Sequence, residues 1–176
     1  VAGYVSGAKL TTSSYNTAMG SQSLYYTTTG HSNLAMGYLA MYGEDGGTMT
    51  GHHNVALGRE ALKVNTTAFQ NVAVGSQSLM ANTTGNYNVA LGYGSLKTQS
   101  GDANYNTAVG YLAGEELTTG DNNTFIGALA GDEATTAEYG VAVGYKAGGS
   151  NTEATGNYNT AVGYTALQNT TTAAGN

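Results

Sequence analysis

Four acidic residues at corresponding positions of neighbouring sequence repeats could bind a cation. They are Glu115, Glu116, Asp132 and Glu133, with Asp132 and Glu133 following the first two at a distance of 17 residues. Like charges this close repel one another unless a cation lies between them, and carboxylate oxygens are ligands that Ca²⁺ prefers. Calcium is therefore the one cofactor that the sequence suggests. The alternative is that these carboxylates are splayed apart and solvated on a surface turn.

Tyrosine is the second residue type that could take part in binding, because the chain has 14 tyrosines and most of them recur in two positions of a repeat. Stacked repeats place equivalent side chains about 4.8 Å apart, so these tyrosines are expected to form aromatic ladders. Such ladders can bind the faces of sugars, or they can simply pack over the turns and stiffen the fold. The candidate glycan contacts are Tyr15, Tyr87, Tyr105, Tyr139 and Tyr158.

Three histidines form a further candidate group. His31 and His52 share a position in successive repeats, and His53 follows directly. Two imidazoles on neighbouring coils could bind a transition metal, although solvent-exposed turn histidines are the simpler interpretation. The sequence offers no nucleophile and base pair and no phosphate-binding loop, so we expect no enzymatic activity and assign no catalytic residue.

These residues are carried by a short repeat that runs through all 176 residues. A glycine recurs at intervals of 17 to 21 residues, and in most repeats it closes a block of the form Asn-x-Ala-aliphatic-Gly. The recurring glycines are Gly3, Gly20, Gly37, Gly58, Gly75, Gly92, Gly110, Gly127, Gly144 and Gly163. Because a repeat this short cannot bury a core alone, the period predicts a parallel β-solenoid, or β-roll, of about ten short coils.

Each coil is expected to contain an apolar strand, a turn at the glycine, a second short strand and a Thr-Gly-rich return. A helix is the competing interpretation of blocks such as NTAVGYTAL, but the repeated glycine and the β-branched residues favour a strand. The recurring asparagines, such as Asn71 and Asn88, predict a structural ladder of stacked amides. Side chains alternate along a strand. We therefore expect the aliphatic positions, such as Val74, to line the coil interior and the Asn-Ala-Gly face to contact another chain.

Composition limits the classes of partner. The chain has 27 Gly, no Pro, no Cys and no Trp, and its net charge is −6. The acidic balance argues against nucleic acid and against anionic membranes, and no apolar run is long enough to span a bilayer. The sequence also predicts no disulfide and no thiolate metal site.

The repeat pattern covers residues 1–176 as a single domain, and both ends are cut within the pattern. Solenoids need caps to cover their open strand edges, and neither end supplies one. We therefore expect a segment of a longer fibre. The one large break in the period lies between Tyr42 and Gly51, and an insertion of this kind is expected to project as a loop or to be neutral.

The blocks NTAVGYTAL and NVALGYGSL resemble the head repeats of trimeric autotransporter adhesins, and even more the Thr-Gly-Asn-rich repeats of phage tail fibres. The resemblance covers essentially the whole chain. It implies three chains around one axis, and thus an intertwined or side-by-side homotrimer. The period here is near 17, which is longer than the period common in adhesin heads, so the turns must be longer.

Together these observations predict a structural and adhesive fibre segment, on a phage tail or a bacterial surface, that attaches to a host cell and could contact glycans along its side. Such a segment would be extracellular, on the virion or the cell surface, and its partner would be a host glycan or receptor. One alternative is a β-solenoid ice-binding protein, because threonines recur in the returns. Another is a polysaccharide-degrading β-helix, although the carboxylates lie in variable turns and not in a cleft.

Overall fold

The structure is a computed structural model that describes residues 2–43, 47–149 and 157–168. In these residues it contains nine β-strands of three residues each. Their bounds are Thr17–Met19 (β1), Leu34–Met36 (β2), Val55–Leu57 (β3), Val72–Val74 (β4), Val89–Leu91 (β5), Thr107–Val109 (β6), Thr124–Ile126 (β7), Val141–Val143 (β8) and Thr160–Val162 (β9).

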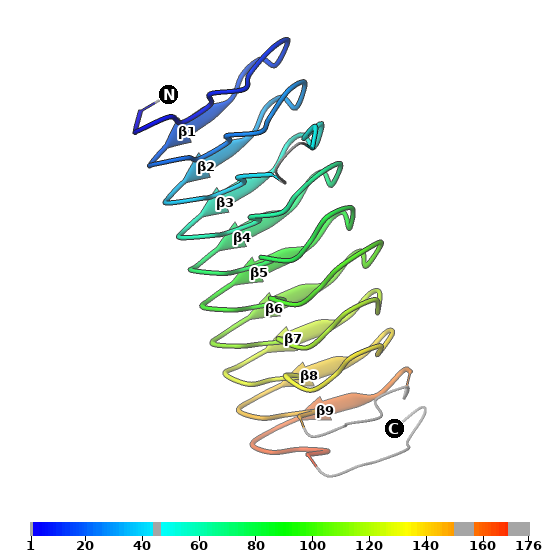
Figure 1. The fold of residues 1–176 in the computed structure, drawn as a ribbon. Coiled ribbons are helices and arrows are strands. Elements are labelled where there is room, and N and C mark those ends of the chain that lie inside the picture. Colours follow the sequence, from blue (N-terminus) through cyan, green and yellow to red (C-terminus); the bar gives the residue numbers. More distant parts are fainter. Residues whose placement is uncertain (1, 44–46, 150–156, 169–176) are drawn as a thin grey trace.

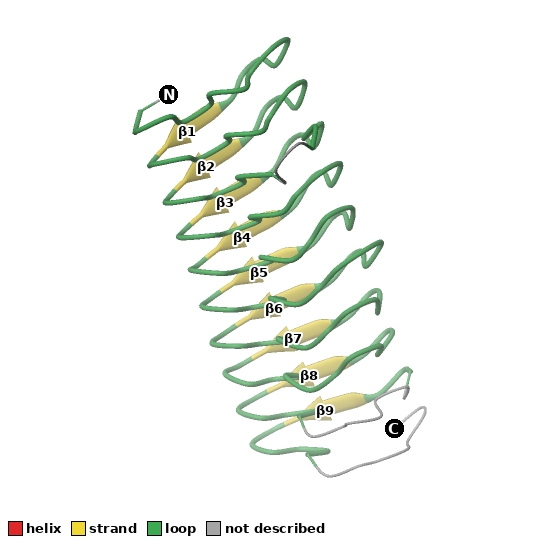
Figure 2. Ribbon diagram, viewed as in Figure 1, coloured by secondary structure: helices red, strands yellow, loops and turns green. Residues whose placement is uncertain are grey.

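All nine strands pair in parallel and in sequence order to form one sheet. Equivalent residues face one another in every pair, as Ala56, Ala73 and Ala90 do in β3, β4 and β5. Figure 1 shows the coils stacked from β1 to β9 as a ladder, and Figure 2 shows that the remainder of each coil is loop and turn. The prediction of an all-β parallel solenoid is confirmed.

The structure differs from the predicted coil in two details. Around Gly3 the chain forms only an isolated bridge, between Ala2 and Met19, so the described residues contain nine strands and not ten. The second strand of each coil does not form within the described residues. After the glycine, the backbone turns through residues with positive φ, such as Gln77 at 62° and Leu79 at 49°, and these angles are incompatible with a strand.

The recurring glycine is conformationally required. These residues have φ between 120° and 141° in the coils of β1 to β9, a region that is essentially restricted to glycine. A Cβ atom built on Gly58 would lie 2.5 Å from the carbonyl oxygen of Gly75 in the next coil. Glycine therefore provides both the backbone turn and the close approach between coils.

The interior of the coil holds the central residue of each strand, which reverses our expectation. Ala73 and Ala90 are completely buried, whereas the aliphatic residues on either side of the central position, such as Val72 and Val74, are only partly buried. The inner space opposite the alanines is occupied by a row of leucines four residues after the glycine, including Leu79. Because these leucines fill a narrow interior, only a methyl group fits beside them, and the larger strand residues point outward.

The leucine row is interrupted in the coils of β6, β7 and β8. The leucine of the earlier coils, as at Leu79 and Leu96, is replaced there by Gly114, Gly131 and Gly148. Phe125, at the centre of β7, takes the place of the usual alanine and is 97% buried, with 3% of its surface exposed. A Cβ built on Gly114 or on Gly131 would lie 2.7 Å from the Phe125 ring. One large side chain therefore fills the space that glycines leave in the neighbouring coils.

The asparagine ladder is confirmed as a structural device. The side-chain oxygen of Asn54 accepts a hydrogen bond from the backbone N–H of Asn71 at 2.9 Å, and that of Asn71 accepts one from Asn88 at 2.9 Å. The Asn71 amide also donates to the carbonyl oxygen of Gly85 at 2.9 Å. These bonds satisfy buried polar groups at the start of each strand.

Some expectations fall on residues that the structure does not describe. The cut ends of the pattern include residues 1 and 169–176, and the insertion includes residues 44–46, all outside the described residues. The described part of the insertion returns to the core, because Met49 is buried and bridges to Thr27. Within the described residues, the fold contains no helix that could cross a membrane.

Candidate functional site

The outer surface of the nine-stranded sheet runs along the described chain and faces solvent. We call it the outward face and define it as the first and third residue of every strand. The first residues form a Thr/Val/Leu row: Thr17, Leu34, Val55, Val72, Val89, Thr107, Thr124, Val141 and Thr160. The third residues form an aliphatic row: Met19, Met36, Leu57, Val74, Leu91, Val109, Ile126, Val143 and Val162.

The outward face carries no charge in either row and is open to solvent along its length. Exposure reaches 45% at Met19, 41% at Ile126 and 67% at Val162. Because the strands are in register, the aliphatic row stacks one aliphatic side chain on another at every step, whereas the Thr/Val/Leu row places Thr beside Leu or Val at several steps, as at Thr17 and Leu34. The aliphatic row thus gives the outward face a continuous apolar strip, a feature that marks interaction sites on soluble proteins.

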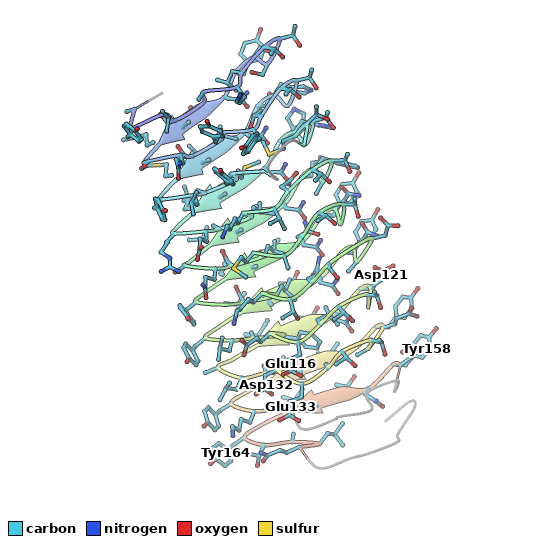
Figure 3. All side chains as sticks on the ribbon, viewed as in Figure 1. Glu116, Asp121, Asp132, Glu133, Tyr158 and Tyr164 are labelled. Carbon is cyan, nitrogen blue, oxygen red and sulfur yellow. The ribbon has the colours of Figure 1, made fainter. Side chains whose placement is uncertain are left out.

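Tyrosines border this strip at both ends of the strands. The leading tyrosine row, in which each residue stands just before the first residue of its block, consists of Tyr15, Tyr87, Tyr105, Tyr139 and Tyr158. The trailing tyrosine row, which follows the glycine, consists of Tyr4, Tyr38, Tyr93, Tyr111, Tyr145 and Tyr164. Figure 3 shows Tyr158 and Tyr164 at opposite ends of β9. All eleven are exposed, so both predicted ladders lie on the surface.

Ring stacking is tightest in the leading row. Tyr87 and Tyr105 have centroids 4.8 Å apart and planes 2° from parallel, and Tyr139 and Tyr158 are 5.0 Å apart at 4°. Members of the trailing row, such as Tyr93 and Tyr111, are 5.6 Å apart at 15°. Paired rings cover one face of each other. A sugar could therefore reach only the outer ring faces, the ring edges and the hydroxyl groups.

Backbone conformation fixes the leading row in place. Tyr87, Tyr105 and Tyr139 have φ of 59°, 58° and 57°, a left-handed conformation that a turn before the strand requires. Their N–H groups donate to the preceding coil, as Tyr105 does to the carbonyl oxygen of Asn86 at 3.1 Å. Directly beside them the buried asparagine ladder ties successive coils together. The tyrosine pairs are therefore held by the same hydrogen bonds that hold the solenoid.

The structure does not bring the four acidic candidates into one site. Glu115 pairs with Lys97, with 2.9 Å between its Oε1 and the lysine Nζ, and Glu116 is exposed. Asp132 is partly buried, and burial raises the pKa of its carboxyl, with a further rise from the charge of Glu133. Within the described residues no group of three or more His, Cys, Asp or Glu side chains is arranged to hold a metal ion. Figure 3 shows where Glu116, Asp132 and Glu133 lie on the later coils.

Sequence reasoning missed a charged cluster around Glu60. Its carboxylate accepts hydrogen bonds from Arg59 at 2.6 Å, from Lys63 at 3.0 Å and from Gln77 of the next coil at 3.1 Å. The hydrogen bonds from Arg59 and then Gln77 lower the pKa of Glu60 to about 2. The three-residue spacing of Glu60 and Lys63 could have indicated their ion pair. The hydrogen bond to Gln77 could not be predicted in this way, because it depends on the register between coils.

The histidines come together as an aromatic group. The His31 and His52 rings stack at 4.9 Å, and the His53 ring lies edge-on to His31 at 5.2 Å. Phe69 extends the stack by packing on His52 at 5.2 Å. Among the described residues these three side chains are not arranged to hold a metal ion.

Comparison with known proteins adds no further constraint. No protein-family model matches the chain, and no curated protein or solved structure matches it significantly.

Proposed function

We propose that this chain is a rod-like segment of an extracellular attachment fibre, on a phage tail or a bacterial surface, and that it assembles as a parallel homotrimer through the outward face. The observation that carries the proposal is the apolar strip that the chain leaves uncovered from β1 to β9. A repeating solenoid provides length and stiffness, which an attachment fibre needs. The resemblance of the repeat blocks to tail-fibre and adhesin repeats supports the same function.

The outward face and the tyrosine rows beside it together offer an extended surface for association. Nine strands at about 4.8 Å, each with three residues at about 3.3 Å, give roughly 400 Å² for the outward face alone, and the two exposed tyrosine rows widen this surface toward the roughly 800 Å² that one partner contributes to a standard protein interface. The composition also fits, because interface cores are depleted of charged residues and enriched in aromatic residues and methionine. A second copy of the same chain presents an identical strip with the same coil spacing.

The interface differs from the one expected from the sequence. The Asn-Ala-Gly face cannot contact another chain, because its alanines are buried inside the coil. The aliphatic row and the Thr/Val/Leu row take that role in the proposal. Closed cyclic symmetry is the usual arrangement of identical chains, and the family resemblance favours three.

The mass of the assembly in solution tests this proposal. Sedimentation of the parent chain should give three times the chain mass. Val74→Lys with Leu91→Lys places charges in the apolar strip and should give folded monomers, because unpaired charge is very costly to bury. Thr67→Lys with Thr119→Lys adds the same charge on exposed returns and should leave the parent mass unchanged. A monomeric parent chain would overturn the trimer.

Contact with host glycans is proposed for the leading tyrosine row. The five tyrosines of this row are exposed in the single chain and border the outward face, and their hydroxyl groups are the contacts that we expect a glycan to use. We expect Tyr87→Phe, Tyr105→Phe and Tyr158→Phe together to weaken binding to host cells or to a glycan array while the rings stay stacked. Undiminished binding by this folded triple variant would assign recognition to another part of the fibre.

The ice-binding alternative has one observation in its favour. The outward face stacks Thr and Val side chains at the coil repeat, whereas the hydroxyls of return threonines such as Thr66 and Thr118 already donate to carbonyl oxygens of the next coil, at 3.0 and 2.8 Å. Any ice-binding surface would therefore be the outward face. Thermal hysteresis by the parent chain that is lost in Val74→Lys with Leu91→Lys would support this alternative.

A further inference from the structure

We propose that the leading tyrosine row is a site of intramolecular dityrosine crosslinking, a modification independent of the proposed attachment function. Tyr87 pairs with Tyr105, and Tyr139 pairs with Tyr158, with centroid distances of 4.8 and 5.0 Å. All four tyrosines are exposed to solvent, so an oxidant in solution can reach them. The reaction joins phenols that the fold already holds side by side.

The chemistry needs a one-electron oxidant, for which a haem peroxidase with hydrogen peroxide is the class we name. Each phenol loses one electron and one proton and becomes a phenoxyl radical. The two radicals combine through their ortho carbons into one C–C bond, and the rings regain aromaticity as their ortho hydrogens move to the phenol oxygens. Overall, two tyrosines and one peroxide give one dityrosine and two waters.

The fold raises the probability of coupling within a pair. Tyr105 N–H donates to Asn86 at 3.1 Å and Tyr158 N–H donates to Glu138 at 3.0 Å, so neither backbone can move away from its neighbouring coil without loss of ladder bonds. Exposed side chains change rotamer on the ps–ns scale, and this freedom lets parallel rings tilt until the ortho carbons meet. A radical formed on one ring therefore has its partner within reach.

The trailing row provides an internal comparison. Tyr93 and Tyr111 are 5.6 Å apart at 15°, and Tyr145 and Tyr164 are 5.5 Å apart at 13°. The centroid distances of these pairs are longer, and their ring planes are less parallel, than those of the leading pairs. We therefore expect the leading pairs to couple first and the trailing pairs to follow at higher oxidant dose.

A crosslink between adjacent coils would also stabilise the solenoid. Tyr105 follows Tyr87 by 18 positions, so a bond between them closes a loop of 18 residues. Closing a loop of this length restricts the denatured chain in the way that a disulfide does. The oxidised chain should therefore melt at a higher temperature than the untreated chain.

The experiment treats the full chain, dilute and folded, with a haem peroxidase and limiting hydrogen peroxide. Dityrosine fluorescence, a mass loss of two hydrogens per bond and peptide mapping report the products. We expect linked peptides that contain Tyr87 with Tyr105 and Tyr139 with Tyr158. Tyr105→Phe keeps the stacked ring and should abolish the first product while it leaves the second unchanged.

Two controls can overturn the proposal. The same oxidation in concentrated urea should scatter the products over many tyrosines, and an unchanged peptide map would show that the fold does not select the pairs. In the folded chain, products dominated by exposed tyrosines outside the stacked pairs, such as Tyr15 and Tyr38, would also overturn it. So would products that form only between chains.

Discussion

The coils of β1 to β5 and the coils of β6 to β8 have the same backbone but fill their interiors differently. The first group uses one leucine or methionine per coil, as at Leu62, Leu79 and Leu96, opposite a strand alanine. The second group has glycine at that position and uses Phe125 from the strand side. Leu96 at φ 50° and Gly131 at φ 60° adopt the same left-handed conformation. The exchange of leucine for glycine is therefore a packing change and not a backbone requirement.

The electrostatics of the two groups also differ. In the first group Glu60 lies among donors that stabilise its charged form. In the second group Asp132 is partly buried beside Glu133, an arrangement that favours its neutral form. The outward face is continuous over both groups, because the hydrogen-bond ladder and the coil spacing do not depend on how the interior is filled. A solenoid can thus vary its interior while it keeps one uniform surface.

The largest effect should come from the recurring glycines, and it should be the same in both groups. Gly58→Ala and Gly127→Ala both place a Cβ 2.5 Å from a carbonyl oxygen of the next coil, at φ of 137° and 133°. We expect each to destabilise by about 3 kcal/mol or more, measured as a loss of thermal and urea stability.

The matched control for these variants is Gly101→Ala. Gly101 has φ 64°, and a Cβ there would meet nothing within 4 Å. It should cost only about 1 kcal/mol, which is the strain of the left-handed conformation. Equal losses in all three variants would show that coil contact at the recurring glycine is unimportant.

The next effect distinguishes the two groups. Phe125→Ala should cost about 3–5 kcal/mol, at the upper end for core truncation, because the glycines around it offer no side chain to fill the cavity. Leu79→Ala should cost less, about 2–3 kcal/mol, because Leu62 and Leu96 flank it in the neighbouring coils and can relax inward. Urea denaturation of the two variants measures both values, and the opposite ranking would contradict the packing comparison.

A compensating substitution sharpens the comparison. The three atoms nearest to a Cβ built on Gly131 all belong to the Phe125 ring. Gly131→Leu alone should therefore destabilise by about 1–3 kcal/mol through overpacking. Added to Phe125→Ala, it should recover about 1–2 kcal/mol, because the coil then has the leucine–alanine pair of the first group. A double-mutant cycle measures this coupling, and simple additivity of the two losses would contradict it.

The smallest effects concern pH. Because the folded pKa of Glu60 is lowered to about 2, its stabilisation is present above its ordinary value of 4.5 and is lost as pH falls toward 2. Glu60→Gln should therefore cost about 1 kcal/mol at neutral pH, after allowance for solvent screening, and the difference from the parent should shrink in acid.

The contribution of Asp132 to stability should depend on pH in the opposite direction. Its pKa is raised in the folded chain, so its contribution to stability is greatest below its ordinary value of 3.8 and is lost as pH rises through the folded value. Asp132→Asn should therefore stabilise the chain at neutral pH and have no effect in strong acid. Thermal melts of Glu60→Gln and Asp132→Asn across the pH range test both predictions. If the stability difference from the parent changed with pH in the same direction for both variants, the opposite pKa shifts assigned to Glu60 and Asp132 would be contradicted.

Much of this architecture could be read from the sequence. The glycine period, the β-branched and aliphatic residues before the glycines and the asparagine at most block starts predicted parallel coils and an amide ladder. Those features act locally or between identical positions of neighbouring coils, so a repeated sequence is enough to specify them. The positions of both tyrosine rows followed from the same period.

The tertiary structure alone decided which side of each strand faces inward. Alternation separates Ala73 from Val72 and Val74 but does not say which set is buried, and hydrophobicity favoured the wrong set. Leu79, from the opposite side of the coil, occupies the interior and leaves room only for a methyl group. The link between Phe125 and Gly131 and the bond between Glu60 and Gln77 likewise join different coils. Such contacts depend on the volumes and register of side chains that meet only when the coils are stacked.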